Sequence, residues 1–405
     1  MASKKKPAAD ADTAADTAAD AAVGVVSVDD DTLPDVITSR IKQGNDAKSQ
    51  LGALLSSELI ASTLKTYGKK SLIEGAEVKA RTVKRIPTGV FPLDYALEGG
   101  WAQGGVHTLT GHKSSCKTTM LYKTIGEAQK MCANCWEYFD RCNCKSPREP
   151  VCAYIDVEGA LDPPWASRHF DLDKVLISTP EYAEQSLSIG EALLRSGRCD
   201  ILVLDSLAFL TPAKEIEEAI EKDMMGTQAR ILGKGIRKFT AALNAAMTET
   251  GRRPTVFFTN QIRMKLGVMF GNPETTPGGL APGFMAWTEV RMKGGKYKMD
   301  DAGERPLYVD FGFSLDKSKA STAKVSYEFR MMLTDAETKV LGDFYDEDFI
   351  LAHAERKGLI SGGGTLWKCL GEQFGKKSEI EKRLVTDPIF KRMVSDVLLR
   401  AVRPT

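Results

Sequence analysis

A short segment between a predicted strand and a predicted helix constrains this chain more than any other feature. Residues 111–119 read GHKSSCKTT, follow an apolar run that begins near Val106, and lead into an apolar helical pattern that resumes at Met120. This is the context of a phosphate-binding loop, in which backbone N–H groups and the start of a helix point at phosphate oxygens. The segment therefore predicts a nucleotide site at the end of a buried strand.

The segment matches the pattern G-x(4)-G-K-[ST] except at Cys116, which stands in place of the second glycine. Lys117 is expected to reach the β- and γ-phosphates, and Thr118 to hold Mg²⁺. A cysteine could distort the loop, because glycine lets the backbone approach the phosphates without a Cβ. Alternatively, the small thiol points away and the loop keeps its shape. The predicted nucleotide-binding residues here are Gly111, Ser114, Ser115, Cys116, Lys117, Thr118 and Thr119.

Composition narrows the class of protein. The chain has 405 residues, of which 42% are hydrophobic and 27% charged, as expected for a soluble protein with a large core. The formal net charge of +1 gives no overall basic field, so any contact with nucleic acid must come from a local patch. No apolar run approaches a membrane span, and the start MASKKK leads into Ala- and Asp-rich sequence. We therefore expect a cytoplasmic protein without a membrane partner.

Strand and helix patterns alternate through the middle of the chain. Near-continuous apolar runs at 151–156, 200–205 and 255–260 predict buried strands, and apolar residues at helical spacing between them predict helices. This alternation indicates an α/β fold with a mainly parallel central sheet covered on both faces, and with ligands at the carboxyl ends of its strands. Before this core, residues 1–45 predict a disordered tail and residues 57–67 an amphipathic helix.

Polar groups stand at the ends of the three apolar runs. Asp205 closes the second run and is placed to bind Mg²⁺, although an N-cap is the alternative. Glu158 lies just past the first run, where a carboxylate could orient or deprotonate an attacking water. Gln261 follows the third run and could contact the γ-phosphate. With the phosphate loop they predict a nucleoside-triphosphatase site whose catalytic residues are Glu158, Lys117 and Gln261.

Cysteines crowd into an insert at 131–150. Four of them follow the pattern C-x2-C, six residues, then C-x-C, on a segment without a core pattern: Cys132, Cys135, Cys142 and Cys144. Four thiolates can close a tetrahedral Zn²⁺ site, and a short insert without a core needs such a staple. The alternative is a set of reduced surface thiols, because the spacing is not that of a standard zinc ribbon.

Three longer segments resemble the RecA family of recombinases, including its phage members of the UvsX type. They read DVEGALDPPWA at 156–166, LVLDSLAFLTPAKEIE at 202–217 and NQIRMKLGVMFGNPETTPGG at 260–279. The resemblance runs from about Ser57 to near the C-terminus and is interrupted by the cysteine insert.

The resemblance implies an architecture and an activity. It implies a RecA-like P-loop ATPase core at 86–340, a small N-terminal polymerisation element at 46–85, and a small α+β C-terminal domain at 341–405 that gates duplex DNA and contains a helix over 380–399. The implied activity is that of an ATP-dependent recombinase, which forms helical filaments on single-stranded DNA, pairs it with homologous duplex and exchanges strands. The alternative is a filament-forming mediator with weak or no ATPase activity, which Cys116 would explain.

The resemblance also assigns nucleotide contacts. Glu158 is similar to the catalytic glutamate of the family, Asp205 to its Mg²⁺-site aspartate, and Gln261 to the glutamine that couples the γ-phosphate to a DNA loop. Asp162 and Trp165 match the pair that flanks adenine, with Trp165 in place of the usual tyrosine. In this family ATP binds between adjacent copies of the chain.

Further matches concern the neighbouring copy and DNA. Lys317 and Lys319 resemble the pair that reaches a neighbour's phosphates, although a solvated lysine pair is the alternative, and Phe284 resembles an aromatic residue that passes the nucleotide signal between subunits. Two DNA-binding loops are implied, at 218–228 and 263–279. The implied DNA contacts are Met225, Gly226, Arg230, Arg237, Arg263, Lys265, Leu266, Gly278 and Gly279.

Overall fold

The computed structural model describes residues 53–54, 57–67, 83–217, 226–264, 273–279, 281–319, 321 and 324–402. The chain divides into two compact units, Met1–Leu72 and Ile73–Thr405. In the first unit, helix α2 (Glu58–Tyr67) confirms the predicted amphipathic helix. Its Leu59 is 75% exposed. The predicted tail at 1–45 lies outside the described residues.

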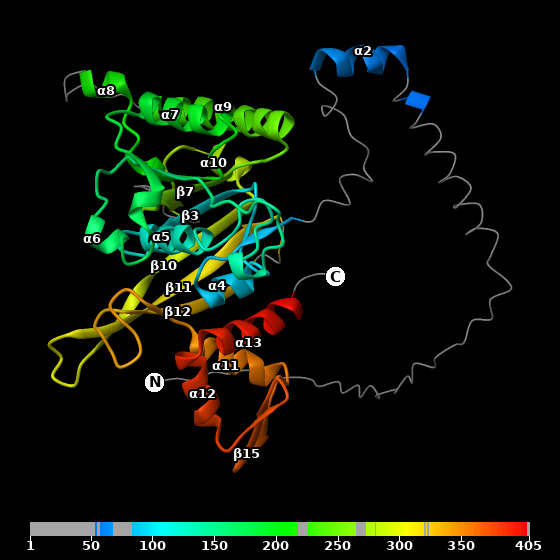
Figure 1. Ribbon diagram of the computed structural model, residues 1–405. Coiled ribbons are helices and arrows are strands. Elements are labelled where there is room, and N and C mark those ends of the chain that lie inside the picture. The colour runs from blue at the N-terminus through cyan, green and yellow to red at the C-terminus, as the bar shows by residue number, and fades with distance from the viewer. Residues whose placement is uncertain are drawn as a thin grey trace, which may run out of the picture. The chain divides into compact units, whose positions relative to one another are not determined.

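The second unit is built on one large sheet. Its strands are β3 (Val106–Gly111), β4 (Cys152–Asp156), β5 (Val175–Ser178), β6 (Ile201–Asp205), β7 (Thr255–Gln261), β10 (Thr288–Met299), β11 (Pro306–Ser318), β12 (Ser326–Met332) and β13 (Phe344–Tyr345). Within the described residues their order is β13-β12-β11-β10-β3-β7-β6-β4-β5. Neighbours are parallel from β10 to β5 and antiparallel from β10 to β13 (Figure 1). The predicted mainly parallel sheet is thus confirmed, with an antiparallel extension.

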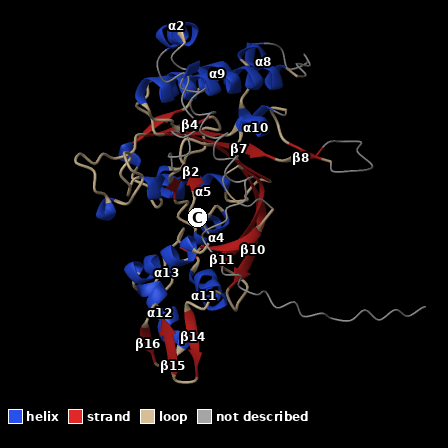
Figure 2. Cartoon of the chain, turned by 90° about the vertical axis from the view of Figure 1, so that its right-hand side faces the viewer, coloured by secondary structure: helices blue, strands red, loops and turns tan. Residues whose placement is uncertain are grey.

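Both faces of the central strands are buried, as their continuous apolar runs require. Val203 and Phe257 join the apolar cluster that includes residues of α5 (Lys117–Ala128). Their neighbours Leu204 and Phe258 point to the other face, into the cluster formed with α7 (Ala183–Arg195) and α9 (Thr227–Thr250). Figure 2 shows α5 and α9 on opposite sides of β7. The alternation follows from the two-residue period of a strand.

Short elements connect this framework. They are β1 (Arg85–Ile86), α4 (Phe91–Ala96), β2 (Trp101–Ala102), η1 (Phe139–Arg141), α6 (Pro163–Ala166), η2 (Leu172–Lys174), η3 (Leu207–Phe209), α8 (Ala213–Glu217), β8 (Arg263–Met264), β9 (Glu274–Thr275) and α10 (Ala281–Met285). Strands β8 and β9 pair in antiparallel fashion and form the stem of the predicted second DNA loop. Among the described helices, none combines the length and apolar character that a membrane crossing needs.

The C-terminal module has its own three-stranded sheet and an apolar cluster that Phe91 of α4 joins. It contains α11 (Glu347–Arg356), β14 (Ile360–Gly363), β15 (Leu366–Cys369), β16 (Glu372–Phe374), α12 (Lys377–Thr386) and α13 (Pro388–Arg400). The single helix predicted over 380–399 is wrong, because the helix breaks at Asp387 and Pro388. The Asp387 side chain accepts hydrogen bonds from the backbone N–H groups of Ile389 and Phe390, both at 3.0 Å, and Pro388 opens the new helix.

Candidate nucleotide site

The predicted phosphate loop joins β3 to α5 at the carboxyl end of the parallel strands. Gly111 lies between Gln261 of β7 and Met292 of β10. A Cβ placed on Gly111 would lie 2.6 Å from the carbonyl oxygen of Met292, which is too close for any side chain. Glycine is therefore required here by the approach of a neighbouring strand, in addition to any contact with phosphate.

Cys116 adopts the conformation that explains why the pattern has glycine at its position. Its φ of 67° and ψ of 18° are left-handed, and it directly precedes α5. A side chain in this region costs about 1 kcal/mol or more relative to glycine. The side chain of Cys116 packs against the apolar cluster around α5, and burial raises the pKa of its thiol to about 12, so it stays neutral. The loop thus keeps its left-handed turn despite the substitution.

Changing Cys116 should reveal that the loop depends on this backbone conformation more than on the thiol. We expect the free energy of unfolding of the Cys116→Gly variant to lie within about 1 kcal/mol of that of the unchanged protein, because relief of backbone strain offsets the lost packing of the side chain. Cys116→Val should lower it by about 2 kcal/mol, because a β-branched residue fits the left-handed region poorly. Urea unfolding measures both. Equal stability of the two variants would contradict the argument.

Lys117 is held inside the loop by oxygen atoms. Its Nζ donates to the carbonyl oxygens of Gly111 at 3.2 Å and His112 at 2.7 Å, and to Oγ of Ser115 at 3.2 Å. Burial lowers the pKa of Lys117. The ammonium group is therefore surrounded by hydrogen-bond acceptors. Phosphate oxygens are acceptors of the same kind and would be suitable partners in their place.

The two predicted Mg²⁺ ligands lie together. Thr118 Oγ1 donates to Oδ2 of Asp205 at 2.6 Å. The hydroxyl of Tyr154 donates to the same oxygen at 2.8 Å, and Thr259 donates to Oδ1. Three hydroxyl groups from α5, β4 and β7 thus orient one buried carboxylate, and Asp205 is not an N-cap. A carboxylate beside a threonine hydroxyl is a donor set that suits Mg²⁺.

Sequence reasoning missed Tyr154 and Thr259. Both belong to strands whose sequences predict only buried apolar runs. The available signal was a hydroxyl group near the carboxyl end of each run, in VCAYID and TVFFTN.

Glu158 lies two residues beyond β4 and is oriented by its neighbours. Ser206 Oγ donates to its Oε1 at 2.7 Å. Partial burial raises the pKa of Glu158, and the negative charge of Asp205 adds to the increase. The turn that carries Glu158 is shaped by Asp156, which accepts from the backbone N–H groups of Leu161 at 2.9 Å and Ala160 at 3.3 Å.

The predicted adenine pair lies close to the phosphate loop. Trp165 Nε1 donates to Oγ1 of Thr119 at 3.3 Å, which connects α6 to the first turn of α5. The indole ring meets His169 edge-on, with ring centroids 5.0 Å apart. Asp162 immediately precedes α6 and is exposed.

The stem of the predicted second DNA loop lies beside the predicted phosphate loop. The backbone N–H of Ile262, between β7 and β8, donates to the Gly111 carbonyl at 3.2 Å, and Oε1 of Glu274 in β9 lies 3.7 Å from Nε2 of His112. Asn260 Nδ2 donates to the carbonyl of Pro277 at 2.9 Å. Gln261 therefore lies where the phosphate loop and this stem meet.

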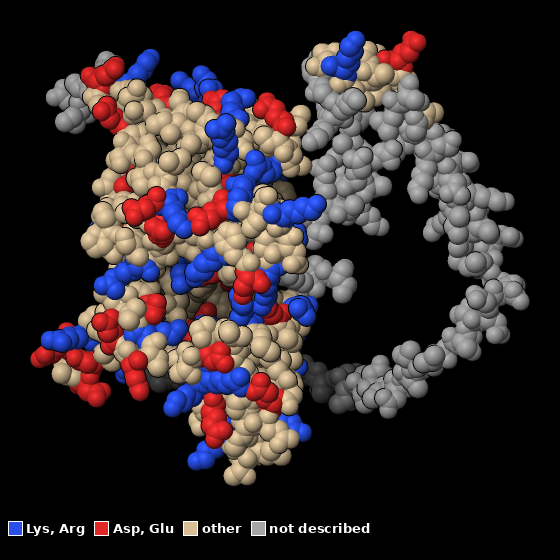
Figure 3. Space-filling view, in the orientation of Figure 1, with Lys and Arg blue, Asp and Glu red and all other residues tan. Residues whose placement is uncertain are grey.

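The remaining predicted contacts are spread over several elements. Arg230 and Arg237 are exposed on α9, and Gly226 precedes that helix with a φ of 79°. Arg263 Nη2 donates to the carbonyl of Ala208 at 3.4 Å. The glycines Gly278 and Gly279 both have positive φ values, of 93° and 65°. Met225, Lys265 and Leu266 lie outside the described residues. Figure 3 shows basic and acidic side chains interspersed on one face of the molecule.

The two lysines predicted to serve a neighbouring copy lie away from the phosphate loop of their own chain. In the register of the sheet, Lys317 of β11 lies opposite Glu289 of β10. Glu289 precedes Met292 by three residues, and Met292 lies opposite Gly111 of β3. That separation is about 10 Å along the strand. Lys317 Nζ donates to the carbonyl of Gly283 in α10 at 2.6 Å, and Lys319 is exposed.

The four cysteines of the insert form a second cluster, separate from the phosphate loop. The Sγ atoms of Cys132, Cys135, Cys142 and Cys144 all lie within 4.8 Å of one another. Those of Cys135 and Cys142 are 3.6 Å apart. Zn–S bonds of about 2.3 Å in a tetrahedron place sulfur atoms about 3.8 Å apart, so the donor set fits Zn²⁺. Scattered surface thiols would not converge in this way.

Comparison with known proteins identifies the family. The family model described as the RecA N-terminal domain matches residues 55–306. The chain belongs to the RecA family. RecA of Mesorhizobium japonicum is 41% identical over 328 residues, which cover 80% of each chain. RecA of Francisella philomiragia is 34% identical over 352 residues, covering 84% of this chain and 87% of that relative, and RecA of Parvibaculum lavamentivorans is 32% identical over 87% of each.

Family membership confirms the predicted RecA-like α/β core. The matched range contains the phosphate loop, Glu158, Asp205 and Gln261. In the structure these predicted site residues lie at the carboxyl edge of the parallel strands β3, β4, β6 and β7.

Proposed function

We propose that this RecA-family chain is a DNA-dependent ATPase and recombinase, which forms helical filaments on single-stranded DNA, pairs it with homologous duplex and exchanges strands in recombination and repair. The observation that carries the proposal is the assembled phosphate-loop edge, where Lys117, the Thr118–Asp205 pair and Glu158 converge in a chain of this family. We also propose that the protein works in the cytoplasm.

Each residue of that edge has a role in hydrolysis. Lys117 would exchange its carbonyl partners for β- and γ-phosphate oxygens, and Thr118 with Asp205 would hold Mg²⁺. Glu158, oriented by Ser206, would position the attacking water and take up its proton. When bound, Mg²⁺ neutralises charge that develops on the phosphate oxygens.

Features of the surface support self-assembly. Lys317 on β11 lies about 10 Å along the sheet from the level of Gly111 and its Nζ is bonded to the Gly283 carbonyl, and Lys319 just after β11 is exposed, so we propose that both contact the phosphates of a second copy. Phe284 on α10 is 75% exposed, as a residue that docks on a neighbour would be. We assign polymerisation to 46–85, the ATPase core to 86–340 and duplex gating to 341–405.

For DNA binding we propose the second loop and α9. Arg263 and Lys265 would neutralise backbone phosphates, with Arg230 and Arg237 as further contacts. Gln261 would transmit the state of the nucleotide to the loop, because it lies between the phosphate loop and the β8–β9 stem. The further contacts proposed here are Met225, Gly226, Leu266, Gly278 and Gly279.

We also propose that the cysteine cluster holds one structural Zn²⁺. The convergence of four Sγ atoms supports this assignment, since a closed four-thiolate set is typical of structural zinc rather than catalytic zinc. The metal would staple residues 131–150, a segment that is too short for a core of its own.

Electron microscopy tests the proposed function. The full chain, mixed with single-stranded DNA and a non-hydrolysable ATP analogue, should form regular helical filaments, and omission of the nucleotide should disperse them. DNA-stimulated ATP hydrolysis then separates the recombinase from a filament-forming mediator. Filaments without hydrolysis would favour the mediator, and absence of nucleotide-dependent filaments would refute the recombinase.

A further inference from the structure

The cysteine insert contacts the C-terminal module through a short polar interface. Arg141 Nη2 lies 2.6 Å from Oδ2 of Asp396, and Asp140 forms an ion pair with Arg392. The guanidinium group of Arg392 also lies over the ring of Tyr138, 5.5 Å from its centroid. Both partners in the module belong to α13, one helical turn apart. We call this set of contacts the insert–α13 interface.

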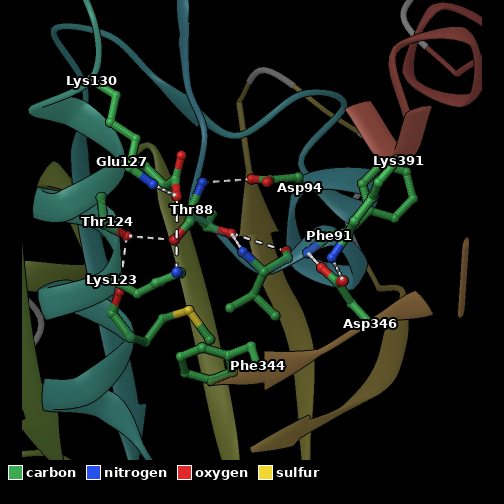
Figure 4. Close-up of polar contacts among 12 residues, drawn as sticks. Thr88, Phe91, Asp94, Lys123, Thr124, Glu127, Lys130, Phe344, Asp346 and Lys391 are labelled. Carbon is green, nitrogen blue, oxygen red and sulfur yellow. Dashed lines mark hydrogen bonds and ion pairs between the residues drawn. The ribbon is translucent and has the colours of Figure 1, made fainter. Parts of the chain in front are cut away.

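On its other side the insert is attached to the helix that begins at the phosphate loop. The Tyr138 hydroxyl donates to Oε2 of Glu127 in α5 at 3.1 Å, and the backbone N–H of Phe139 donates to the Lys130 carbonyl at 3.1 Å. Glu127 is itself held by Lys130 at 2.7 Å and Lys123 at 3.9 Å, as Figure 4 shows. Tyr138 thus contacts α5 and α13 at once.

All insert residues at this interface lie in the six-residue segment between two cysteines of the cluster, Cys135 and Cys142. Trp136 at the start of this segment is buried in the apolar cluster around α5, and Tyr138 packs against that cluster, whereas the helical turn η1 contains no buried residue, so packing does little to fix Asp140 and Arg141. A metal held by both flanking cysteines would close the segment into a small loop and remove most of its conformational freedom. The positions of Asp140 and Arg141 would then depend on the metal.

We propose that the zinc-bound insert is a clasp that holds α13 against the ATPase core. The proposal rests on the zinc assignment above. A separate attachment does not involve the insert: Lys391 pairs with Asp346, whose carboxylate accepts from the backbone N–H of Phe91 in α4 at 2.9 Å (Figure 4). Loss of zinc would therefore loosen α13 without detaching the module. Partly exposed ion pairs are individually weak, so the clasp can open and close.

Hydrogen exchange on the full chain, preceded by elemental analysis, tests the clasp. We expect about one zinc per chain, lost in the double variant Cys142→Ser with Cys144→Ser and retained in Cys199→Ser, whose thiol lies outside the cluster. Zinc loss should raise exchange of α13 amides about tenfold, because two ion pairs and a cation–π contact are lost. Exchange in β14–β16 should stay unchanged.

A charge swap at constant zinc isolates the contact itself. Asp396→Arg should raise exchange in α13 about fivefold. Arg141→Asp combined with Asp396→Arg should restore it, and Glu381→Arg, an equal charge change on α12, should have no effect. Absence of zinc would overturn the metal assignment and leave the recombinase untouched. If zinc is bound but its removal leaves hydrogen exchange in α13 unchanged, the clasp is overturned. It is also overturned if the charge swap does not restore the exchange rate.

Discussion

Replacing Lys117 with alanine is expected to lower ATP hydrolysis in the presence of single-stranded DNA by about 10²–10³-fold. The ammonium group is the cation inside the phosphate loop, held by the carbonyls of Gly111 and His112, and no other described lysine is bonded to these atoms. Its removal leaves the negative charge of the transferring phosphoryl group without this stabilising partner. Steady-state release of phosphate, with DNA saturating, measures the effect.

Lys113 offers a matched control in the same loop. It is exposed, four residues before Lys117, and Lys113→Ala removes the same charge without touching the hydrogen-bond acceptors around Lys117. We expect the ATPase activity of Lys113→Ala to stay within about threefold of that of the unchanged protein, because the effect of an exposed charge is screened by salt. Equal losses in the two variants would show that the loop acts only through its overall charge. Circular dichroism should confirm that both variants are folded.

Glu158→Gln is expected to lower the rate constant of hydrolysis by about 10²–10⁴-fold while ATP and DNA binding persist. An amide oxygen can still accept from Ser206 Oγ, now 2.7 Å from the carboxylate, so the geometry is kept and only the ability to take a proton is lost. Filaments formed with ATP should therefore outlast those of the unchanged protein. Single-turnover hydrolysis and filament lifetime measure the two effects separately.

The dependence on pH provides a sharper test of Glu158. A general base must be deprotonated, so hydrolysis should fall as the pH drops through the pKa of this residue. Partial burial raises that pKa above the ordinary 4.5, so the loss begins at a higher pH than for an exposed glutamate. The Gln variant should lack this acid limb. Glu181→Gln, at an exposed carboxylate, should retain it, and an identical pH profile for Glu158→Gln would rule out the role.

Much of the site could be predicted from local sequence. The phosphate loop is contiguous, and Asp205 and Glu158 stand at the ends of apolar runs, which parallel strands bring to one edge. The partners of these residues could not be predicted in the same way. Tyr154 and Thr259 lie in strands whose apolar neighbours dominate the pattern, and only strand order decides that their hydroxyl groups converge on Asp205.

The sequence by itself determined the elements with strong local periodicity or a contiguous motif: the buried strands, the loop at Lys117, the four cysteines and the family. Tertiary structure alone decided that the cysteine insert lies against α13. Asp140 and Arg392 are 252 positions apart, and their ion pair produces no periodic pattern in the sequence of either segment. Apolar periodicity reports which face of an element is buried. It carries no information on which distant polar side chain an exposed charge will meet.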